Sequence, residues 1–184
     1  MQGDINKYYD KRIQTDKAII NDIANEAYGA NKKMLVFGLG YDSKLWYNLT
    51  NKNTFFVEHN EEYIQKNKDI SASNIIRYSY TGITVKSSFS MTDKEINSFI
   101  IPDELIKNAP YDIIYIDGPT GYLPDKPGRL LPIYWSSTVL SKPGSIVYID
   151  DCNRPLETIC IDKYFKEYKK SMINVRDGCM KIVC

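Results

Sequence analysis

The chain alternates between short apolar runs and segments in which apolar residues recur every three or four positions. The short runs are typical of strands that are buried on both faces. The recurring pattern is typical of helices with one apolar face. The predicted strands cover residues 34–37, 54–57, 75–80, 113–116, 145–149, 171–175 and 180–183, and the predicted helices cover 4–29 (one helix or two), 45–49, 61–68, 131–140 and 156–170.

Strands and helices follow one another along most of the chain, which is the pattern of an α/β protein with a doubly wound, mostly parallel sheet. Only residues 176–179 separate the last two strands, so we expect seven strands that finish in an antiparallel C-terminal hairpin. Residues 1–184 fit a single domain. Within it, residues 1–30 form a helical lead-in with Gly29 as its stop, and Thr92 and Glu95 form a capping box.

Residues 34–58 read as a strand, a glycine turn, a helix and a second strand that ends in an acid. Gly38 and Gly40 follow the first strand directly, and Glu58 ends the second. Glycines at this point let the backbone approach a ligand in the crevice beyond the strand ends. The segment is therefore typical of the first half of a nucleotide-binding unit.

The residues after the glycines indicate which nucleotide would bind. A dinucleotide site has a third glycine and faces a pyrophosphate, but this chain has Ser43 there, and Asp42 would repel the pyrophosphate. S-adenosylmethionine fits better, because Asp42 attracts its amino group and sulfonium and Glu58 accepts from its ribose hydroxyls. We therefore predict a class I methyltransferase with a Rossmann-like sheet. An NAD-type domain and a tight turn without a ligand are the alternatives.

The predicted cofactor site combines this unit with the acid that follows the fourth strand. His59 would lie near the ribose edge, although an exposed loop histidine is the competing interpretation. The residues assigned to the cofactor are Phe37, Gly38, Gly40, Asp42, Ser43, Glu58, His59 and Asp117.

Asp117 follows one buried strand, and Asp150 and Asp151 follow another. In a doubly wound sheet these strand ends share one edge. Carboxylates that converge repel one another unless they are protonated or bind a cation, and Mg²⁺ accepts such oxygens. We therefore predict a divalent-cation site at Asp117, Asp150 and Asp151, which would bind two vicinal acceptor oxygens and lower the pKa of one. A metal-free scheme with Asp117 or Asp151 as general base, and a solvated turn at 150–151, are left open.

Arg129 ends a long loop rich in glycine and proline, residues 118–129. Its guanidinium would pair bidentately with a substrate carboxylate, and a structural salt bridge is the alternative. Asp117, Asp151 and Arg129 are thus the predicted catalytic residues.

Composition narrows the class of partner. Lys and Arg number 24 against 23 Asp and Glu, a net charge of +1, so no overall field attracts nucleic acid or anionic lipid. Residues 1–10 lack the apolar core of a signal peptide, and no apolar run is long enough to cross a membrane. The four cysteines match no zinc motif. We expect a soluble, cytoplasmic protein with no nucleic-acid or membrane partner, and a homo-oligomer is left open.

Several stretches resemble the polysaccharide-biosynthesis methyltransferases typified by plant glucuronoxylan 4-O-methyltransferase. The resemblance covers roughly residues 34–154. It is carried by residues 36–43 with Trp46, residues 56–58, residues 111–119, and the loop from Gly121-Tyr122 to Pro127-Gly128-Arg129.

The resemblance implies S-adenosylmethionine-dependent methylation of a sugar hydroxyl, with a divalent cation. It also implies that Gly38, Gly40, Asp42 and Glu58 hold the cofactor, and that Asp117, Arg129 and Asp151 face the acceptor. Asp150 stands where the family usually has His, and Thr120 where it often has Lys. These departures favour an acceptor sugar other than glucuronate on xylan.

The sequence therefore predicts an O-methyltransferase that acts on a sugar hydroxyl of a glycan or sugar precursor. One alternative is an O-methyltransferase for a catechol-like small molecule, which would also present vicinal hydroxyls. Another is a degenerate methyltransferase fold that serves as a binding module. The intact set of Asp42, Glu58, Asp117 and Asp151 argues against the degenerate fold.

Overall fold

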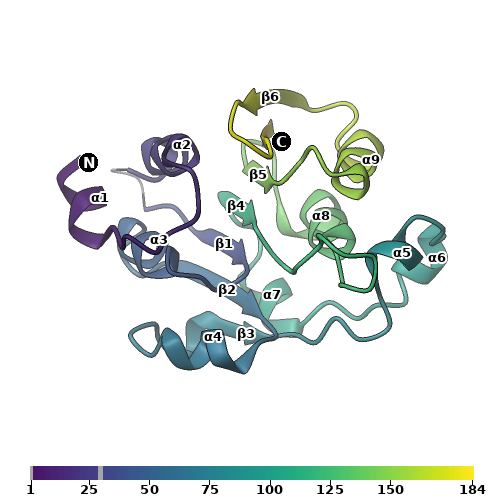
Figure 1. The fold of residues 1–184 in the computed structure, drawn as a ribbon, viewed down its shortest axis with the longest axis horizontal. Coiled ribbons are helices and arrows are strands. Elements are labelled where there is room, and N and C mark those ends of the chain that lie inside the picture. The colour runs from purple at the N-terminus through teal and green to yellow at the C-terminus, as the bar shows by residue number, and fades with distance from the viewer. Residues whose placement is uncertain (1, 29–30) are drawn as a thin grey trace.

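The computed structural model describes residues 2–28 and 31–184, and a sheet of seven strands runs through the centre of this part of the chain (Figure 1). The strands lie in the order β3-β2-β1-β4-β5-β7-β6. β1 to β5 are parallel, whereas β7 is antiparallel to both β5 and β6. The predicted fold class is confirmed. The bounds are β1 Met34–Phe37, β2 Thr54–Glu58, β3 Ile75–Arg77, β4 Ile113–Ile116, β5 Ile146–Asp150, β6 Lys169–Ile173 and β7 Cys179–Val183.

Helices cover both faces of the sheet (Figure 1). One face carries α1 Gln2–Tyr8, α2 Lys17–Ala27, α3 Ser43–Leu49 and α4 Glu61–Lys66. The other carries α6 Asp93–Ile96, α7 Asp103–Asn108, α8 Leu130–Trp135, the π-helix η2 Ser136–Leu140 and α9 Pro155–Tyr164. The short elements α5 Val85–Ser88 and η1 Ala72–Asn74 complete the described helices.

Alternate residues of each central strand face opposite sides of the sheet. In β1, Met34 and Val36 pack beneath α1 to α4, whereas Leu35 and Phe37 pack on the opposite face. A strand covered on both faces needs an apolar residue at every position, and all four residues of β1 are buried. The unbroken apolar runs in the sequence are therefore the signature of the central strands, and each run ends at the edge where the predicted site residues lie.

Element boundaries differ from the predictions where tertiary contacts decide them. β3 ends at Arg77 because this residue pairs with Glu58, the last residue of its partner β2. The rings of Tyr78 and Tyr80 instead pack against each other with centroids 4.9 Å apart. The last helix ends at Tyr164 because residues from Lys169 onward pair with β7. α7 was not predicted. Residues 4–29 contain two helices, and the predicted stop at Gly29 lies outside the described residues. The capping box of Thr92 and Glu95 is confirmed.

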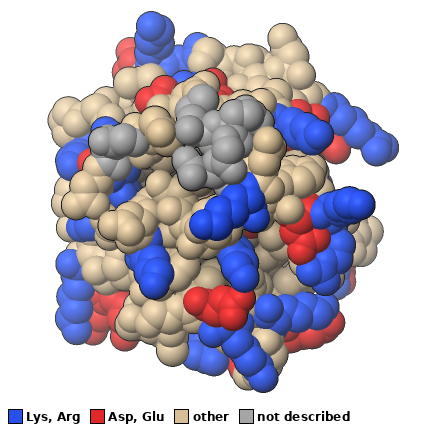
Figure 2. Space-filling view, turned by 90° about the vertical axis from the view of Figure 1, so that its left-hand side faces the viewer, with Lys and Arg blue, Asp and Glu red and all other residues tan. Residues whose placement is uncertain are grey.

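The surface carries charges of both signs. On the face shown in Figure 2, Lys and Arg side chains lie between uncharged residues, with Asp and Glu among them. Among residues 2–28 and 31–184, no helix has both the length and the apolar character that are needed to span a bilayer.

Candidate functional site

The loops that follow β1 and β4 touch each other at the carboxyl edge of the sheet. Gly38 has a φ of +112°, and a Cβ added to Gly118 would lie 3.1 Å from both the Cα of Gly38 and the carbonyl oxygen of Phe37. Both glycines are therefore needed for this close approach. The backbone N–H groups of Gly38, Leu39 and Gly40 donate to Val57 O, Glu58 Oε2 and Ser43 Oγ at 2.8–2.9 Å. The glycine turn thus shapes the site while its amides bond within the protein.

Glu58 is buried at the end of β2 and organises the adjoining backbone. Its Oε2 accepts from Leu39 N at 2.8 Å, and its Oε1 accepts from His59 N and Asn60 N at 2.7 Å. The Nδ1 atom of His59 lies 3.1 Å from the same Oε1. A carboxylate has about four acceptor positions, so Glu58 can hold its loop and still accept from a ligand hydroxyl.

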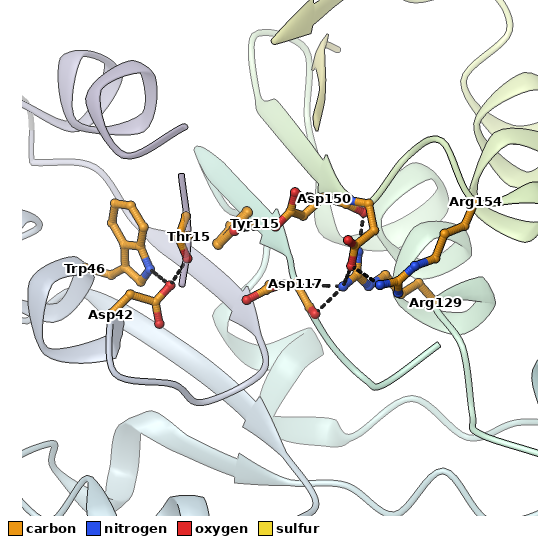
Figure 3. A network of polar contacts seen from close by, with 9 residues as sticks. Thr15, Asp42, Trp46, Tyr115, Asp117, Arg129, Asp150 and Arg154 are labelled. Carbon is orange, nitrogen blue, oxygen red and sulfur yellow. Dashed lines mark hydrogen bonds and ion pairs between the residues drawn. The ribbon is translucent and has the colours of Figure 1, made fainter. Parts of the chain in front are cut away.

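Asp42 is buried beside α3, and two side chains donate to its Oδ2 atom. Thr15 Oγ1 donates at 2.8 Å and the indole Nε1 of Trp46 at 2.9 Å, as Figure 3 shows. Burial raises the pKa of Asp42, and the bonds from Trp46 and Thr15 oppose that rise. The other oxygen, Oδ1, lies 2.8 Å from where a Cβ on Gly40 would be. Only glycine at position 40 leaves this carboxylate in place.

A pocket of about 380 Å³ opens above these loops. This volume lies in the usual range for small-molecule sites. Of the predicted cofactor residues, Gly38, Gly40, Asp42, Glu58, His59 and Asp117 line it. Phe37 and Ser43 do not line the pocket but support its loops. The carbonyl oxygen of Phe37 accepts a hydrogen bond from Gly118 N, and Ser43 Oγ accepts one from Gly40 N. The acceptor oxygens of Glu58 and the close-packed glycines suit S-adenosylmethionine; we call this cavity the cofactor pocket.

Asp117 follows β4 and lies between the Asp42 cluster and a second polar cluster around Arg129 (Figure 3). Burial in the surrounding protein disfavours the charged form of Asp117 and raises its pKa to about 7. The positive charge of Arg129 opposes this rise, whereas the negative charges of Asp42, Asp150 and Asp151 add to it. Protons can reach this carboxyl group, because 41% of the side chain is open to water. Asp117 is therefore a carboxyl group poised to exchange a proton near neutral pH.

Arg129 is a buried cation that joins the ends of β4 and β5. Its Nη2 donates to Asp117 O at 2.5 Å and to Asp151 Oδ2 at 2.6 Å, while Nη1 donates to Asp150 O. Only 3% of its side chain is exposed. The alternative interpretation, a structural salt bridge, therefore describes Arg129 better than a free clamp for a substrate carboxylate.

The three predicted metal ligands line one cavity, but Asp150 and Asp151 already pair with other groups of the protein. Asp151 pairs with Arg129 and, at 2.9 Å, with Arg154 Nη2. Asp150 accepts from Tyr115 Oη at 3.1 Å and from the backbone N–H of Asp151. Among the described residues, no group of His, Cys, Asp and Glu is arranged to hold a metal ion. Arg129 supplies the positive charge between these carboxylates, so this arrangement does not fit the predicted cation site.

A second cavity of about 520 Å³ adjoins the cofactor pocket. Gln14, Asp117, Asp151 and Arg154 line both. Most of its other lining residues are polar: Thr15, Asp16, Asp150, Arg176 and Asp177, with Ile19 and Val175 as the apolar ones. We call this cavity the polar cleft. Sequence reasoning missed Gln14 and Arg154, because neither ends a strand or carries a motif.

Comparisons with known proteins agree with the motifs. No family model matches the chain. Glucuronoxylan 4-O-methyltransferase 1 from Arabidopsis thaliana is 28% identical over 88% of this chain. Arabinogalactan O-methyltransferase 1 from the same plant is 27% identical over 73%. The chain spans 64% and 55% of the length of these two relatives.

The fold matches solved methyltransferases as well. The O-methyltransferase of tomaymycin synthesis from Streptomyces achromogenes, solved in complex with S-adenosylmethionine, superposes with a TM-score of 0.56 at 12% identity. The match covers 98% of this chain and 85% of the other. The chain thus has the class I, Rossmann-like methyltransferase fold, and its predicted resemblance in sequence to the plant polysaccharide O-methyltransferases is confirmed.

Proposed function

We propose that this protein is an S-adenosylmethionine-dependent O-methyltransferase that acts on a sugar hydroxyl of a glycan or sugar precursor. The observation that carries the proposal is the position of Asp117. It lies on the boundary between the cofactor pocket and the polar cleft, and its pKa is raised to about 7. Transfer of a methyl group to a hydroxyl calls for a general base at the place where the cofactor and the acceptor hydroxyl meet.

The residues of the cofactor pocket suit a nucleoside with a charged tail. Glu58 would accept from the ribose hydroxyls, with His59 beside it. The carboxylate of Asp42 would attract the positive end of the cofactor. The bonds from Thr15 and Trp46 to its Oδ2 hold it in place. When bound, S-adenosylmethionine supplies an electrophilic methyl group on its sulfonium sulfur.

In this scheme Asp117 accepts the proton of the acceptor hydroxyl as the oxygen attacks. Arg129 is fixed to Asp151 and to the backbone of Asp117, so it holds the base in place and limits the repulsion between the two acids. The pocket and the cleft adjoin each other and would orient their ligands for transfer, and such positioning supplies a large share of the acceleration in bimolecular transfers.

The lining of the polar cleft supports a sugar over a catechol-like acceptor. It presents carboxylates, guanidinium groups, an amide and a hydroxyl, which pair with the hydroxyls of a sugar. An aromatic acceptor would favour apolar walls, and here Ile19 and Val175 are the apolar contributors. The polysaccharide substrates in the names of the relatives point the same way.

Two measurements test the proposal. Calorimetric titration with S-adenosylhomocysteine, in Mg²⁺ and in EDTA, tests the cofactor site. Transfer of labelled methyl from S-adenosylmethionine to glucuronoxylan and arabinogalactan oligosaccharides, and to catechol, then tests the acceptor class. Binding without transfer to any acceptor would favour a binding module, and absence of binding would overturn the proposal. The divalent cation stays a prediction, which transfer in EDTA would contradict.

A further inference from the structure

Gln14 lies where the cofactor pocket meets the polar cleft. Four residues line both cavities, and Gln14 is the uncharged member, beside Asp117, Asp151 and Arg154. In the proposed function, a methyl group passes from one cavity to the other across this boundary. The sulfur of the cofactor, and the amino-acid end attached to it, would therefore lie next to Gln14.

The segment that carries Gln14 is held in place by contacts of the residues on both sides of it. Residues 12–16, which we call the strap, form the second part of the connection between α1 and α2. Ile13 is buried, Thr15 Oγ1 donates to Asp42 Oδ2 at 2.8 Å, and Asp16 Oδ1 accepts from Ala18 N at 2.7 Å at the start of α2. The Gln14 side chain is exposed and makes no hydrogen bond to any described residue. The strap thus presents a free amide at a fixed place.

The amino-acid end of S-adenosylmethionine carries an ammonium and a carboxylate. Asp42 lines the pocket and suits the ammonium. The carboxylate needs N–H donors, but the amides of Gly38, Leu39 and Gly40 already donate within the protein. The side-chain amide of Gln14 offers two N–H donors, next to Thr15 and its bond to Asp42.

We propose that Gln14 donates a hydrogen bond to the carboxylate of the bound cofactor. The inference rests on the proposed function, because it requires S-adenosylmethionine in the cofactor pocket. It assigns to the strap a role in binding the cofactor that neither a glycine motif nor an acid at a strand end would reveal.

The test compares S-adenosylhomocysteine with 5′-methylthioadenosine, which lacks the amino-acid end. Gln14→Ala should weaken binding of S-adenosylhomocysteine roughly three- to tenfold, the effect of one hydrogen bond, and leave binding of 5′-methylthioadenosine unchanged. Gln14→Glu should weaken the first ligand further, because it sets a like charge against the carboxylate. Gln65→Ala is the matched control, since Gln65 is an α4 glutamine outside both cavities.

The outcomes separate this inference from the proposed function. Equal loss of affinity for both ligands in Gln14→Ala would mean that the strap acts only through structure, and no loss for either would mean that Gln14 makes no contact. Both results would overturn the inference while the wild type still binds S-adenosylhomocysteine. Failure of the wild type to bind would overturn the proposed function, and the inference with it.

Discussion

Arg129 Nη2 lies 2.6 Å from Asp151 Oδ2 and 2.5 Å from the carbonyl oxygen of Asp117. One buried guanidinium therefore connects the ends of the two strands that carry the acids of the site. A planar, always charged group with five N–H donors suits this position better than the ammonium of a lysine would. The connection holds the boundary between the cofactor pocket and the polar cleft in one shape.

Replacing Arg129 should reduce stability more than replacing its neighbour. Arg129→Met leaves two carbonyl groups without their donor and Asp151 with the partly exposed Arg154 alone, which should cost about 3–5 kcal/mol and, for a chain of this length, lower Tm by roughly 2–4 °C per kcal/mol. Arg154→Met is the matched control, because Arg154 pairs with the same Asp151 while 30% of its side chain is exposed. Thermal unfolding measures both variants. Equal loss in the two would contradict the central role of Arg129.

The pH dependence of methyl transfer should follow the ionisation of Asp117. Because its pKa is raised to about 7, the basic carboxylate form is lost as pH falls below 7. We expect kcat/KM to rise with pH through about 7 and then level off. Asp117→Asn should lower kcat/KM roughly 10²- to 10⁴-fold, the usual share of a general base, and abolish this dependence. A flat wild-type profile from acid to neutral pH would contradict the assignment.

The same shift predicts how stability changes with pH. The folded protein binds the proton of Asp117 more tightly than the unfolded chain does, so this group makes folding less favourable as pH rises from about 4 to about 7. Asp117→Asn removes that contribution. Denaturant unfolding of the wild type and Asp117→Asn at pH 5 and pH 7.5 would show it, as a smaller loss of stability in the variant over this interval. An equal loss would mean that the pKa of Asp117 is not raised.

The sequence predicted those parts of the site that depend on local rules. A buried parallel strand ends at a known edge, so the positions of Glu58 and Asp117 followed from their place after apolar runs. Gln14 and Arg154 could not be found in this way, because their place in the site depends on contacts between distant segments. The bond that fixes the strap joins Thr15 to Asp42, 27 residues apart. The metal site stays a prediction, because the topology brings the acids to one edge of the sheet but does not fix where a cation such as Arg129 will lie.

Glu58 should be tested with glutamine rather than alanine. Glu58→Ala leaves the N–H groups of Leu39, His59 and Asn60 without their acceptor, so it should reduce stability as well as binding. Glu58→Gln keeps the shape and one carbonyl acceptor while it removes the charge that a ribose hydroxyl would meet. We expect affinity for S-adenosylhomocysteine to fall about tenfold or more, with a smaller loss of Tm than in the alanine variant. Unchanged affinity in Glu58→Gln would remove the ribose assignment.

Gly118→Ala tests whether the contact between the β1 and β4 loops shapes the cofactor pocket. The added Cβ would lie 3.1 Å from Gly38 Cα and from Phe37 O, and these backbone atoms cannot rotate away. The loops must separate, which should cost about 1–3 kcal/mol of stability and weaken binding of S-adenosylhomocysteine.

Gly144→Ala is the matched control for this contact. Apart from Gly144 and its two chain neighbours, no heavy atom of the described residues lies within 4 Å of a Cβ built at this position, whereas its φ of +87° strains any other residue. The control should therefore also lose about 1 kcal/mol or more of stability but bind S-adenosylhomocysteine as the wild type does. We therefore expect both variants to lose stability, but only Gly118→Ala to lose affinity for S-adenosylhomocysteine. If Gly118→Ala bound S-adenosylhomocysteine like the wild type, the cofactor would not depend on the approach of the two loops, and the pocket above Gly38 would not be its site.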